Sequence, residues 1–187
     1  SSRKIPEAMA WAATLKDGET SVAKQVEKGK SQFAGPEIKG KTLGIIGLGA
    51  IGALVANAAV ALGMKVVGTD PFLSVGAALR LDPSVTVVKT QDDVFAAADY
   101  LTIHVPFNKD TEGMINAAAI AKMKDGVCII NTSRGTNVDE AALLAALESG
   151  KVRAAGLDVY ADEPTANAAL YSHPMVSCTP HIGAATV

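Results

Sequence analysis

Three side chains late in the chain have the chemistry of a hydride-transfer site. Arg134 lies in NTSRG, Glu163 in LDVYADEP and His181 in TPHIG, each at or just after the end of a predicted strand. An arginine can hold a carboxylate through two parallel hydrogen bonds, and a histidine can take up and return a proton near neutral pH. A glutamate can orient that histidine and favour its charged form. Together these groups suit the interconversion of a 2-hydroxy acid and its 2-oxo acid.

Each of these residues also has an ordinary structural explanation. Arg134 could be a surface arginine, Glu163 a loop carboxylate and His181 a histidine satisfied by local hydrogen bonds. The catalytic hypothesis requires a fold that gathers the ends of successive strands, as a doubly wound sheet does. The other two histidines, His104 and His173, are interpreted as structural, with His104 at most lining a cofactor.

The stretch GIIGLGAIG contains a glycine pattern that can hold a dinucleotide. Gly47, Gly49 and Gly52 form G-x-G-x-x-G directly after an apolar strand and at the start of a helix. The spacing allows a tight turn, close approach of the backbone to a pyrophosphate, and close packing of the helix on the strand. An ordinary glycine-rich turn would look the same, so the glycines alone are weak evidence.

Asp70 strengthens the dinucleotide hypothesis. It ends the next predicted strand, KVVGTD, about 20 residues after the glycines, where a carboxylate can accept hydrogen bonds from the adenosine ribose. A carboxylate at this place repels a 2′-phosphate, and TDPF supplies no arginine beside it. The sequence therefore predicts NAD rather than NADP as the cofactor.

The order of the predicted elements indicates an α/β protein. From Lys41 onward, short β-branched runs alternate with alanine-rich stretches, which is typical of βαβ units around a parallel sheet covered on both faces. Strands are predicted at LGII, KVVGTD, VTVV, YLTIHV, VCIIN, AAGLDVY and MVSCT, and helices at about residues 50–63, 74–81, 91–98, 116–123 and 139–149. Two helical pieces, around Ile5 and Val22, precede them. We expect a doubly wound Rossmann sheet in three αβα layers.

The same pattern predicts how the chain is divided. We expect a helical lead-in at residues 1–40, a Rossmann core at 41–178 and a loop carrying the catalytic histidine at 179–187. With 187 residues, 49% of them hydrophobic, the chain can bury one substantial core. A net charge of −2 offers no basic patch for nucleic acid or a membrane surface, and no apolar run approaches the ~20 residues of a membrane span. We expect a cytoplasmic protein with no metal site.

The motifs occur in the order found in a known family. The chain resembles the D-isomer-specific 2-hydroxyacid dehydrogenases over nearly its whole length, through G-L-G-x-I-G, Asp70, HVP, INTSRG, VDEAALLAALESGKVRAAGLDVYADEP and TPHIGA. Within that family, SRKIPEA and GTDPF are most similar to the phosphoglycerate dehydrogenases. The resemblance implies NAD-dependent oxidation of 3-phosphoglycerate to 3-phosphohydroxypyruvate in serine biosynthesis.

The resemblance also implies a role for each candidate residue. His181 would be the catalytic acid and base, Glu163 its partner, and Arg134 the ligand of the substrate carboxylate. Asp158 would meet the nicotinamide end of the cofactor. The implied cofactor-binding residues are Gly47, Gly49, Ala50, Ile51, Gly52, Asp70, Val105, Pro106, Thr132, Ser133, Arg134, Asp158, His181, Gly183 and Ala184.

One departure from the family concerns its second domain. Members carry a substrate-recognising domain, built from chain ahead of the helix at Ile5 and after the histidine motif, that this sequence does not include. We therefore expect this chain to be a cofactor domain that binds NAD without turning over substrate by itself, from a protein that forms a homodimer or larger assembly. The open alternatives are a dehydrogenase for D-lactate, glyoxylate or hydroxypyruvate, and a dinucleotide-sensing corepressor of the C-terminal-binding-protein type.

Overall fold

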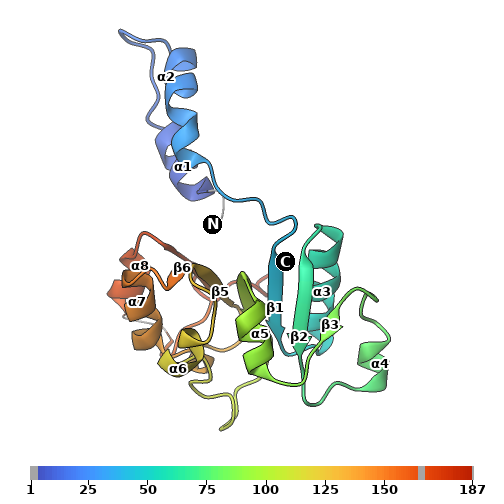
Figure 1. Ribbon diagram of the computed structural model, residues 1–187. Helices are drawn as coiled ribbons and strands as arrows, with labels where there is room; N and C mark the ends of the chain where they lie inside the picture. Colours follow the sequence, from blue (N-terminus) through green and yellow to red (C-terminus); the bar gives the residue numbers. More distant parts are fainter. Residues whose placement is uncertain (1–3, 164–166, 187) are drawn as a thin grey trace. The chain divides into compact units, whose positions relative to one another are not determined.

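The N-terminal helices form a compact unit of their own. In the computed structural model, which describes residues 4–163 and 167–186, contacts divide the chain into units Ser1–Ile38 and Lys39–Val187 (Figure 1). The first unit contains α1 (Ile5–Ala12), α2 (Val22–Gly29) and the 3₁₀ turn η1 (Lys30–Phe33). The rings of Trp11 and Phe33 pack with their centroids 5.2 Å apart. Both predicted helical pieces are present.

The second unit is built on a seven-stranded sheet whose neighbouring strands are all parallel. Its order is β3-β2-β1-β4-β5-β6-β7. The strands are β1 (Thr42–Ile46), β2 (Lys65–Thr69), β3 (Thr86–Val87), β4 (Tyr100–Ile103), β5 (Val127–Asn131), β6 (Val152–Leu157) and β7 (Val176–Cys178). All seven predicted strands are present, β3 as two residues only.

The strand order reverses at β1, which lies between β2 and β4. Ile46, the last residue of β1, is level with Thr69 of β2 and Ile103 of β4. In open α/β sheets, ligands bind outside the carboxyl ends of the strands at such a reversal. The loops that leave this edge begin at Gly47, Asp70, His104, Thr132, Asp158 and Thr179. The candidate residues predicted from the sequence are these residues or lie shortly after them.

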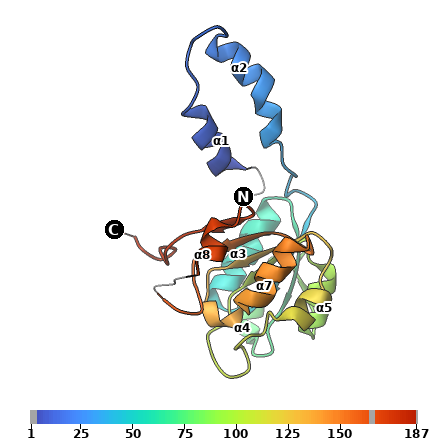
Figure 2. The ribbon, with the colours of Figure 1, turned by 90° about the vertical axis from the view of Figure 1, so that its left-hand side faces the viewer.

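Helices cover both faces of the sheet. They are α3 (Ala50–Ala61), α4 (Val75–Ala78), α5 (Gln91–Ala97), α6 (Ala117–Ala121), α7 (Glu140–Glu148) and α8 (Ala168–Ser172). The connection through α3 runs from β1 to β2, whereas that through α5 runs in the opposite direction, from β3 to β4. Because such crossovers are right-handed, α3 and α5 lie on opposite faces (Figures 1 and 2). The expected three-layer arrangement is confirmed.

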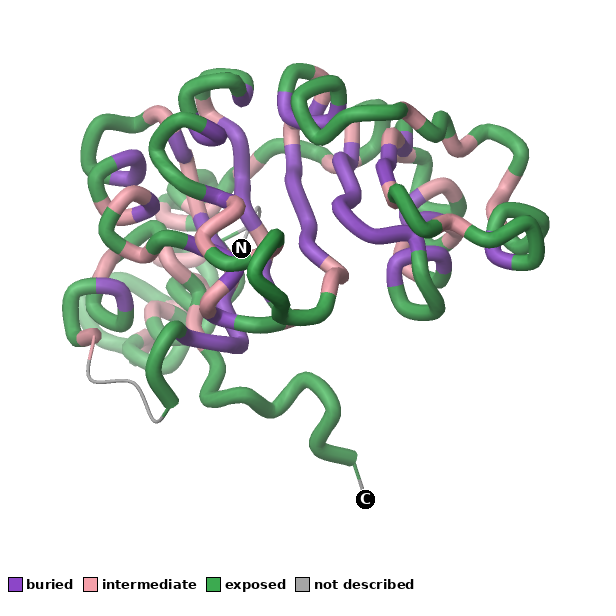
Figure 3. Tube along the Cα trace, turned by 90° about the horizontal axis from the view of Figure 1, so that it is seen from below, coloured by how far each residue is buried: buried purple, intermediate pink, exposed green. Residues whose placement is uncertain are grey.

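The main core lies on the α5–α8 side of the sheet. It contains Leu101, Ile129 and Val152 from the strands and Leu143 and Leu170 from the helices, all fully buried. Figure 3 shows buried backbone running along the strands and exposed backbone in most of the loops. The loops that carry the candidate residues therefore project from a rigid, packed base.

The helix boundaries differ from the predicted ones in the short elements. The helices expected at 74–81 and 116–123 span only Val75–Ala78 and Ala117–Ala121. The five-residue helix α8 was not predicted, because a single buried residue, Leu170, gives no periodicity; Asn167 caps it by accepting the N–H of Leu170. Among residues 4–163 and 167–186, no helix has both the length and the apolarity needed to span a bilayer.

Candidate active site

The loop between β1 and α3 has the form of a dinucleotide cradle. Gly47 has φ +93°, and a methyl group there would lie 2.6 Å from the carbonyl oxygen of His104. A methyl group at Gly52 would collide with the carbonyl oxygen of Gly47, whereas one at Gly49 would meet no atom within 4 Å. Packing thus requires glycine at Gly47 and Gly52. Gly49, directly before α3, is the point left open for a ligand.

The first residues of α3 add donors to this cradle. The helix begins at Ala50, with Gly49 as its N-cap, and Ile51 is exposed. The first N–H groups of a helix have no acceptor within it and lie at the positive end of its dipole. The N–H groups of Ala50 and Ile51 therefore suit the pyrophosphate of a dinucleotide.

Asp70 is fixed beside the same loop. Its Oδ2 accepts the N–H of Leu48 at 3.0 Å, and its Oδ1 accepts the N–H of Phe72 at 2.9 Å. Each carboxylate oxygen has room for a second hydrogen bond. The carboxylate can therefore receive both hydroxyl groups of a ribose while holding the loop in shape, and the residues present fit NAD.

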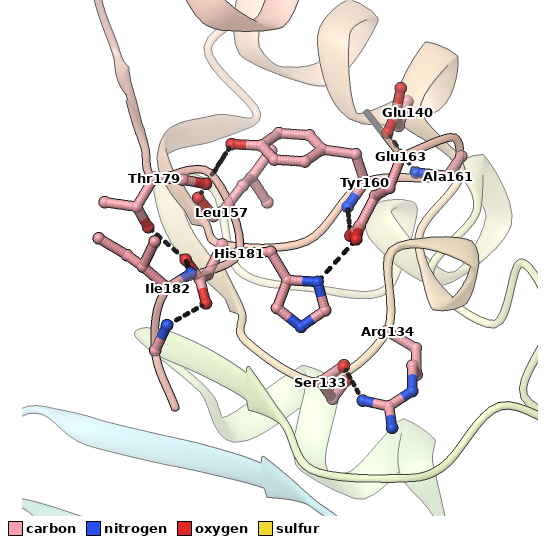
Figure 4. Close-up of polar contacts among 12 residues, drawn as sticks. Ser133, Arg134, Glu140, Leu157, Tyr160, Ala161, Glu163, Thr179, His181 and Ile182 are labelled. Carbon is pink, nitrogen blue, oxygen red and sulfur yellow. Dashed lines mark hydrogen bonds and ion pairs between the residues drawn. The ribbon is translucent and has the colours of Figure 1, made fainter. Parts of the chain in front are cut away.

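The turn after β5 presents Arg134. Asn131, which is almost fully buried, accepts the N–H and the hydroxyl of Ser133 at 3.1 and 2.9 Å and donates to the carbonyl of Arg134 at 2.9 Å. The guanidinium group is exposed and donates to the carbonyl of Ser133 at 2.7 Å (Figure 4). Sequence reasoning missed Asn131. A polar residue closing the apolar run VCII was the available signal.

A second buried asparagine joins this turn to the loop after β4. The amide nitrogen of Asn137 donates to the carbonyl of Val105 at 3.3 Å and to the hydroxyl of Ser133 at 3.2 Å. Asn137 is fully buried. Val105 and Ser133, both expected beside the cofactor, are thus held near each other, with Pro106 and Thr132 exposed next to them.

The central pair of the site is His181 and Glu163. The Nδ1 atom of His181 lies 2.6 Å from Oε2 of Glu163, whose Oε1 accepts the N–H of Tyr160 at 3.1 Å (Figure 4). The hydrogen bond to His181, followed by that from Tyr160, lowers the pKa of Glu163 below its ordinary value. An ionised carboxylate only accepts, so Nδ1 carries the proton and Nε2 is left as the proton acceptor. In Figure 4 that edge of the ring faces the turn of Ser133 and Arg134.

Asp158 fixes the loop that carries His181. Its Oδ1 accepts the hydroxyl of Thr179 at 2.6 Å and the N–H of Ile182 at 2.9 Å, and its Oδ2 accepts the N–H of Gly183 at 2.7 Å. The residue is 5% exposed. Burial opposes ionisation, but the hydrogen bonds outweigh it and lower the pKa of Asp158. His181, held between these anchors, has φ +55°, an uncommon value for a residue other than glycine.

This anchoring role was not expected from the sequence. Asp158 was predicted to meet the nicotinamide end of the cofactor, and Gly183 and Ala184 to line it. Three hydrogen bonds leave one acceptor position on the Asp158 carboxylate, so that prediction stays open. A methyl group at Gly183 would lie 2.8 Å from Oδ2 of Asp158, which explains the glycine.

Tyr160 packs inside the domain, where it supports the loop that carries His181. It is 4% exposed, and its hydroxyl donates to the carbonyl of Thr179 at 2.9 Å. Burial raises the pKa of Tyr160, so the hydroxyl stays protonated and remains a donor. A methyl group at Gly135 would collide with the backbone of Tyr160. The loops after β5, β6 and β7 are therefore packed together, and they bring Arg134, Glu163 and His181 to one edge of the sheet.

The other two histidines have local partners. Nε2 of His104 lies 3.0 Å from the hydroxyl of Thr102, and burial lowers the pKa of His104. Nδ1 of His173 accepts the N–H of Met175 at 3.1 Å. Their structural interpretation agrees with these contacts. In the part of the chain that the structure describes, no cluster of three or more His, Cys, Asp or Glu could hold a metal ion.

Comparison with known proteins identifies the family. Residues 5–183 match the model of the D-isomer specific 2-hydroxyacid dehydrogenase, NAD-binding domain. The chain belongs to this family. The resemblance noted in the sequence is thereby confirmed, as are the Rossmann fold and NAD as the cofactor class.

Individual relatives cover the chain almost completely. It is 45% identical to the D-3-phosphoglycerate dehydrogenase of Bacillus subtilis over 163 residues, and this stretch covers 87% of this chain and 30% of that protein. It is 46% identical over 160 residues to the hydroxypyruvate reductase of Thermotoga maritima, 84% of this chain and 50% of that one. The crystal structure of apo D-mandelate dehydrogenase from Rhodotorula graminis matches with a TM-score of 0.82 at 34% identity, covering 100% of this chain and 53% of that one. The chain thus spans between 30% and 53% of the length of these relatives.

Proposed function

We propose that this chain is the cofactor-binding and proton-transfer domain of an NAD-dependent D-2-hydroxyacid dehydrogenase. The observation that carries the proposal is the His181–Glu163 hydrogen bond of 2.6 Å at the carboxyl edge of the sheet, with Nε2 facing the turn of Arg134. A histidine held by a carboxylate, beside an exposed arginine and a dinucleotide cradle, suits proton removal from a hydroxy acid.

The proposed mechanism divides the work among three side chains. Arg134 binds the substrate carboxylate through two parallel hydrogen bonds and so orients the hydroxyl-bearing carbon. Nε2 of His181 accepts the hydroxyl proton in oxidation and returns it in reduction, while Glu163 stabilises the imidazolium. Bound NAD supplies the hydride acceptor. Gly49, Asp70 and the N-terminus of α3 would hold it.

The proposed substrate is 3-phosphoglycerate, oxidised to 3-phosphohydroxypyruvate on the way to serine. The 45% identity to a D-3-phosphoglycerate dehydrogenase supports this choice. The hydroxypyruvate reductase at 46% identity keeps a non-phosphorylated hydroxy acid as the alternative substrate. We also propose that the full-length protein is cytoplasmic, forms a homodimer or larger assembly, and binds neither nucleic acid nor membranes.

A substrate screen on the full-length protein tests the proposal. With NAD, formation of NADH from 3-phosphoglycerate should exceed that from D-glycerate, D-lactate and D-mandelate by at least about tenfold in kcat/KM, since a phosphate group adds charged contacts that these acids cannot make. A preference for one of the non-phosphorylated acids would overturn the substrate assignment. Tight NAD binding with no oxidation of any of the four acids would overturn the dehydrogenase proposal itself.

A further inference from the structure

Glu140 makes two hydrogen bonds to the segment that carries Glu163. Its Oε1 accepts the N–H of Ala161 at 2.8 Å, and its Oε2 accepts the side-chain amide of Asn167 at 2.6 Å (Figure 4 shows the first). Ala161 precedes Glu163 and Asn167 follows it. One carboxylate thus binds one residue before and one residue after Glu163, the residue that pairs with His181.

Glu140 itself stands on a fixed base. It is the first residue of α7, a helix held in the core by Leu143 and Leu147 and capped by Asp139, which accepts the N–H of Ala142 at 3.0 Å. The helix N-terminus also favours a negative charge at Glu140. A group that is hydrogen-bonded to this carboxylate is therefore held in a fixed position relative to the core.

The residues just before Glu163 are exposed. Ala161 and Glu163 are exposed, and the carboxylate of Glu163 accepts the N–H of Tyr160 at 3.1 Å. The hydrogen bonds to Glu140 therefore add an attachment of Ala161 and Asn167 to the rigid part of the domain. Side chains that orient a catalytic group from behind commonly change activity when they are replaced.

We propose that Glu140 is a positioning residue for the Glu163–His181 pair. It holds Ala161 and Asn167 at the N-terminus of α7, so that Oε2 of Glu163 stays within hydrogen-bond distance of Nδ1 of His181. The role needs a carboxylate, because both partners are donors and both oxygens must accept. A glutamine offers one oxygen and turns an NH₂ group toward the other donor, which leaves that donor without an acceptor. The catalytic consequence rests on the proposed function, but the positional claim does not.

The first test measures the His181–Glu163 hydrogen bond directly by NMR. In the unmodified protein, the Nδ1 proton of His181 should give a downfield resonance that disappears in Glu163→Gln. Glu140→Gln should shift that resonance upfield and broaden it, whereas Glu148→Gln, at the exposed other end of the same helix, should leave it in place. An unchanged resonance in a folded Glu140→Gln variant would overturn the proposal. This readout requires no substrate.

The second test is a double-mutant cycle on the full-length enzyme. Glu140→Gln should lower kcat about tenfold with NAD affinity unchanged, because misplacement by about 1 Å can cost ~10²-fold. In a Glu163→Gln background the same change should lower kcat less than about twofold, since the two residues act through one hydrogen bond. Equal tenfold losses in both backgrounds would contradict the proposal.

A further variant guards against a folding defect. Asn167→Asp keeps an N-cap acceptor for α8 but removes the donor to Glu140 and adds a like charge. It should reproduce the kcat loss and the NMR change of Glu140→Gln. Normal kcat and an intact His181 resonance in Asn167→Asp would count against the proposal. If the unmodified protein oxidised no hydroxy acid, the proposed function would fail. The NMR result would still decide the role of Glu140.

Discussion

The imidazole of His181 and the carboxylate of Glu163 are joined at 2.6 Å across two loops that leave different strands. Glu163 follows β6, and His181 follows β7 and is held by the hydrogen bonds that Asp158 makes around it. The pair therefore depends on the relative positions of neighbouring strands rather than on any local turn. This is how a rigid sheet places catalytic groups that are distant in the sequence.

The second and third glycines of the motif should respond differently to a methyl group. Gly49→Ala meets open space, so we expect the melting temperature to be kept and NAD affinity to fall at least about tenfold, as the methyl occupies the approach to the pyrophosphate. Gly52→Ala meets the carbonyl of Gly47, and the unfolding free energy should drop by about 1–3 kcal/mol. Thermal melts and NAD titrations of both variants give the result. Full NAD affinity in Gly49→Ala would place the pyrophosphate elsewhere.

Asp70 should set the choice of cofactor. Asp70→Ala removes the acceptor of the ribose hydroxyls, so NADH binding should weaken by about 1.5–3 kcal/mol while NADPH binding changes less. Asp125→Asn is the matched control, because Asp125 pairs with Lys151 on the surface at the amino-end edge of the sheet. Calorimetric titration of both dinucleotides measures the preference. Equal affinities in the unmodified protein would contradict the role of Asp70.

Glu163→Gln should change how the reaction depends on pH. The variant keeps the shape of the side chain but loses the charge that stabilises the imidazolium. Reduction requires charged His181, so the fall of kcat/KM at rising pH should begin at lower pH in the variant. The pH profile of the reductive reaction in the full-length enzyme is the measurement. Superimposable profiles would make Glu163 a bystander.

Acid should release the histidine loop before it unfolds the core. The pKa values of Asp158 and Glu163 are both lowered in the folded protein. Groups of this kind contribute stability above their unfolded pKa, near 4, and lose it as the pH falls through the folded value. The amide of Gly183 should therefore stay protected from hydrogen exchange at pH 6 and lose protection below about pH 4, ahead of Leu143. Simultaneous loss at both positions would contradict this order.

The sequence predicted the fold and the three catalytic candidates, but not the residues that hold them. Apolar strands, the glycine spacing and an acid after the second strand are local patterns, and each leaves a signature in a short window. The contacts of Asn137 and Glu140 join loops that are far apart in the chain, and Asn131 holds the turn of Ser133 and Arg134 from within. Their side chains have no periodicity or spacing that distinguishes them from ordinary caps and turn residues. Asp158 was found, but its hydrogen bonds to the histidine loop depend on the packing of β6 beside β7.

Replacement of the histidine tests the central claim most directly. His181→Asn is the suitable variant, because asparagine tolerates the left-handed backbone found there, φ +55°, yet cannot accept and return a proton. In the full-length enzyme with 3-phosphoglycerate and NAD, kcat should fall by about 10²–10⁴, with NAD affinity and melting temperature nearly unchanged. Turnover within about threefold of the unmodified enzyme would show that proton transfer takes place elsewhere.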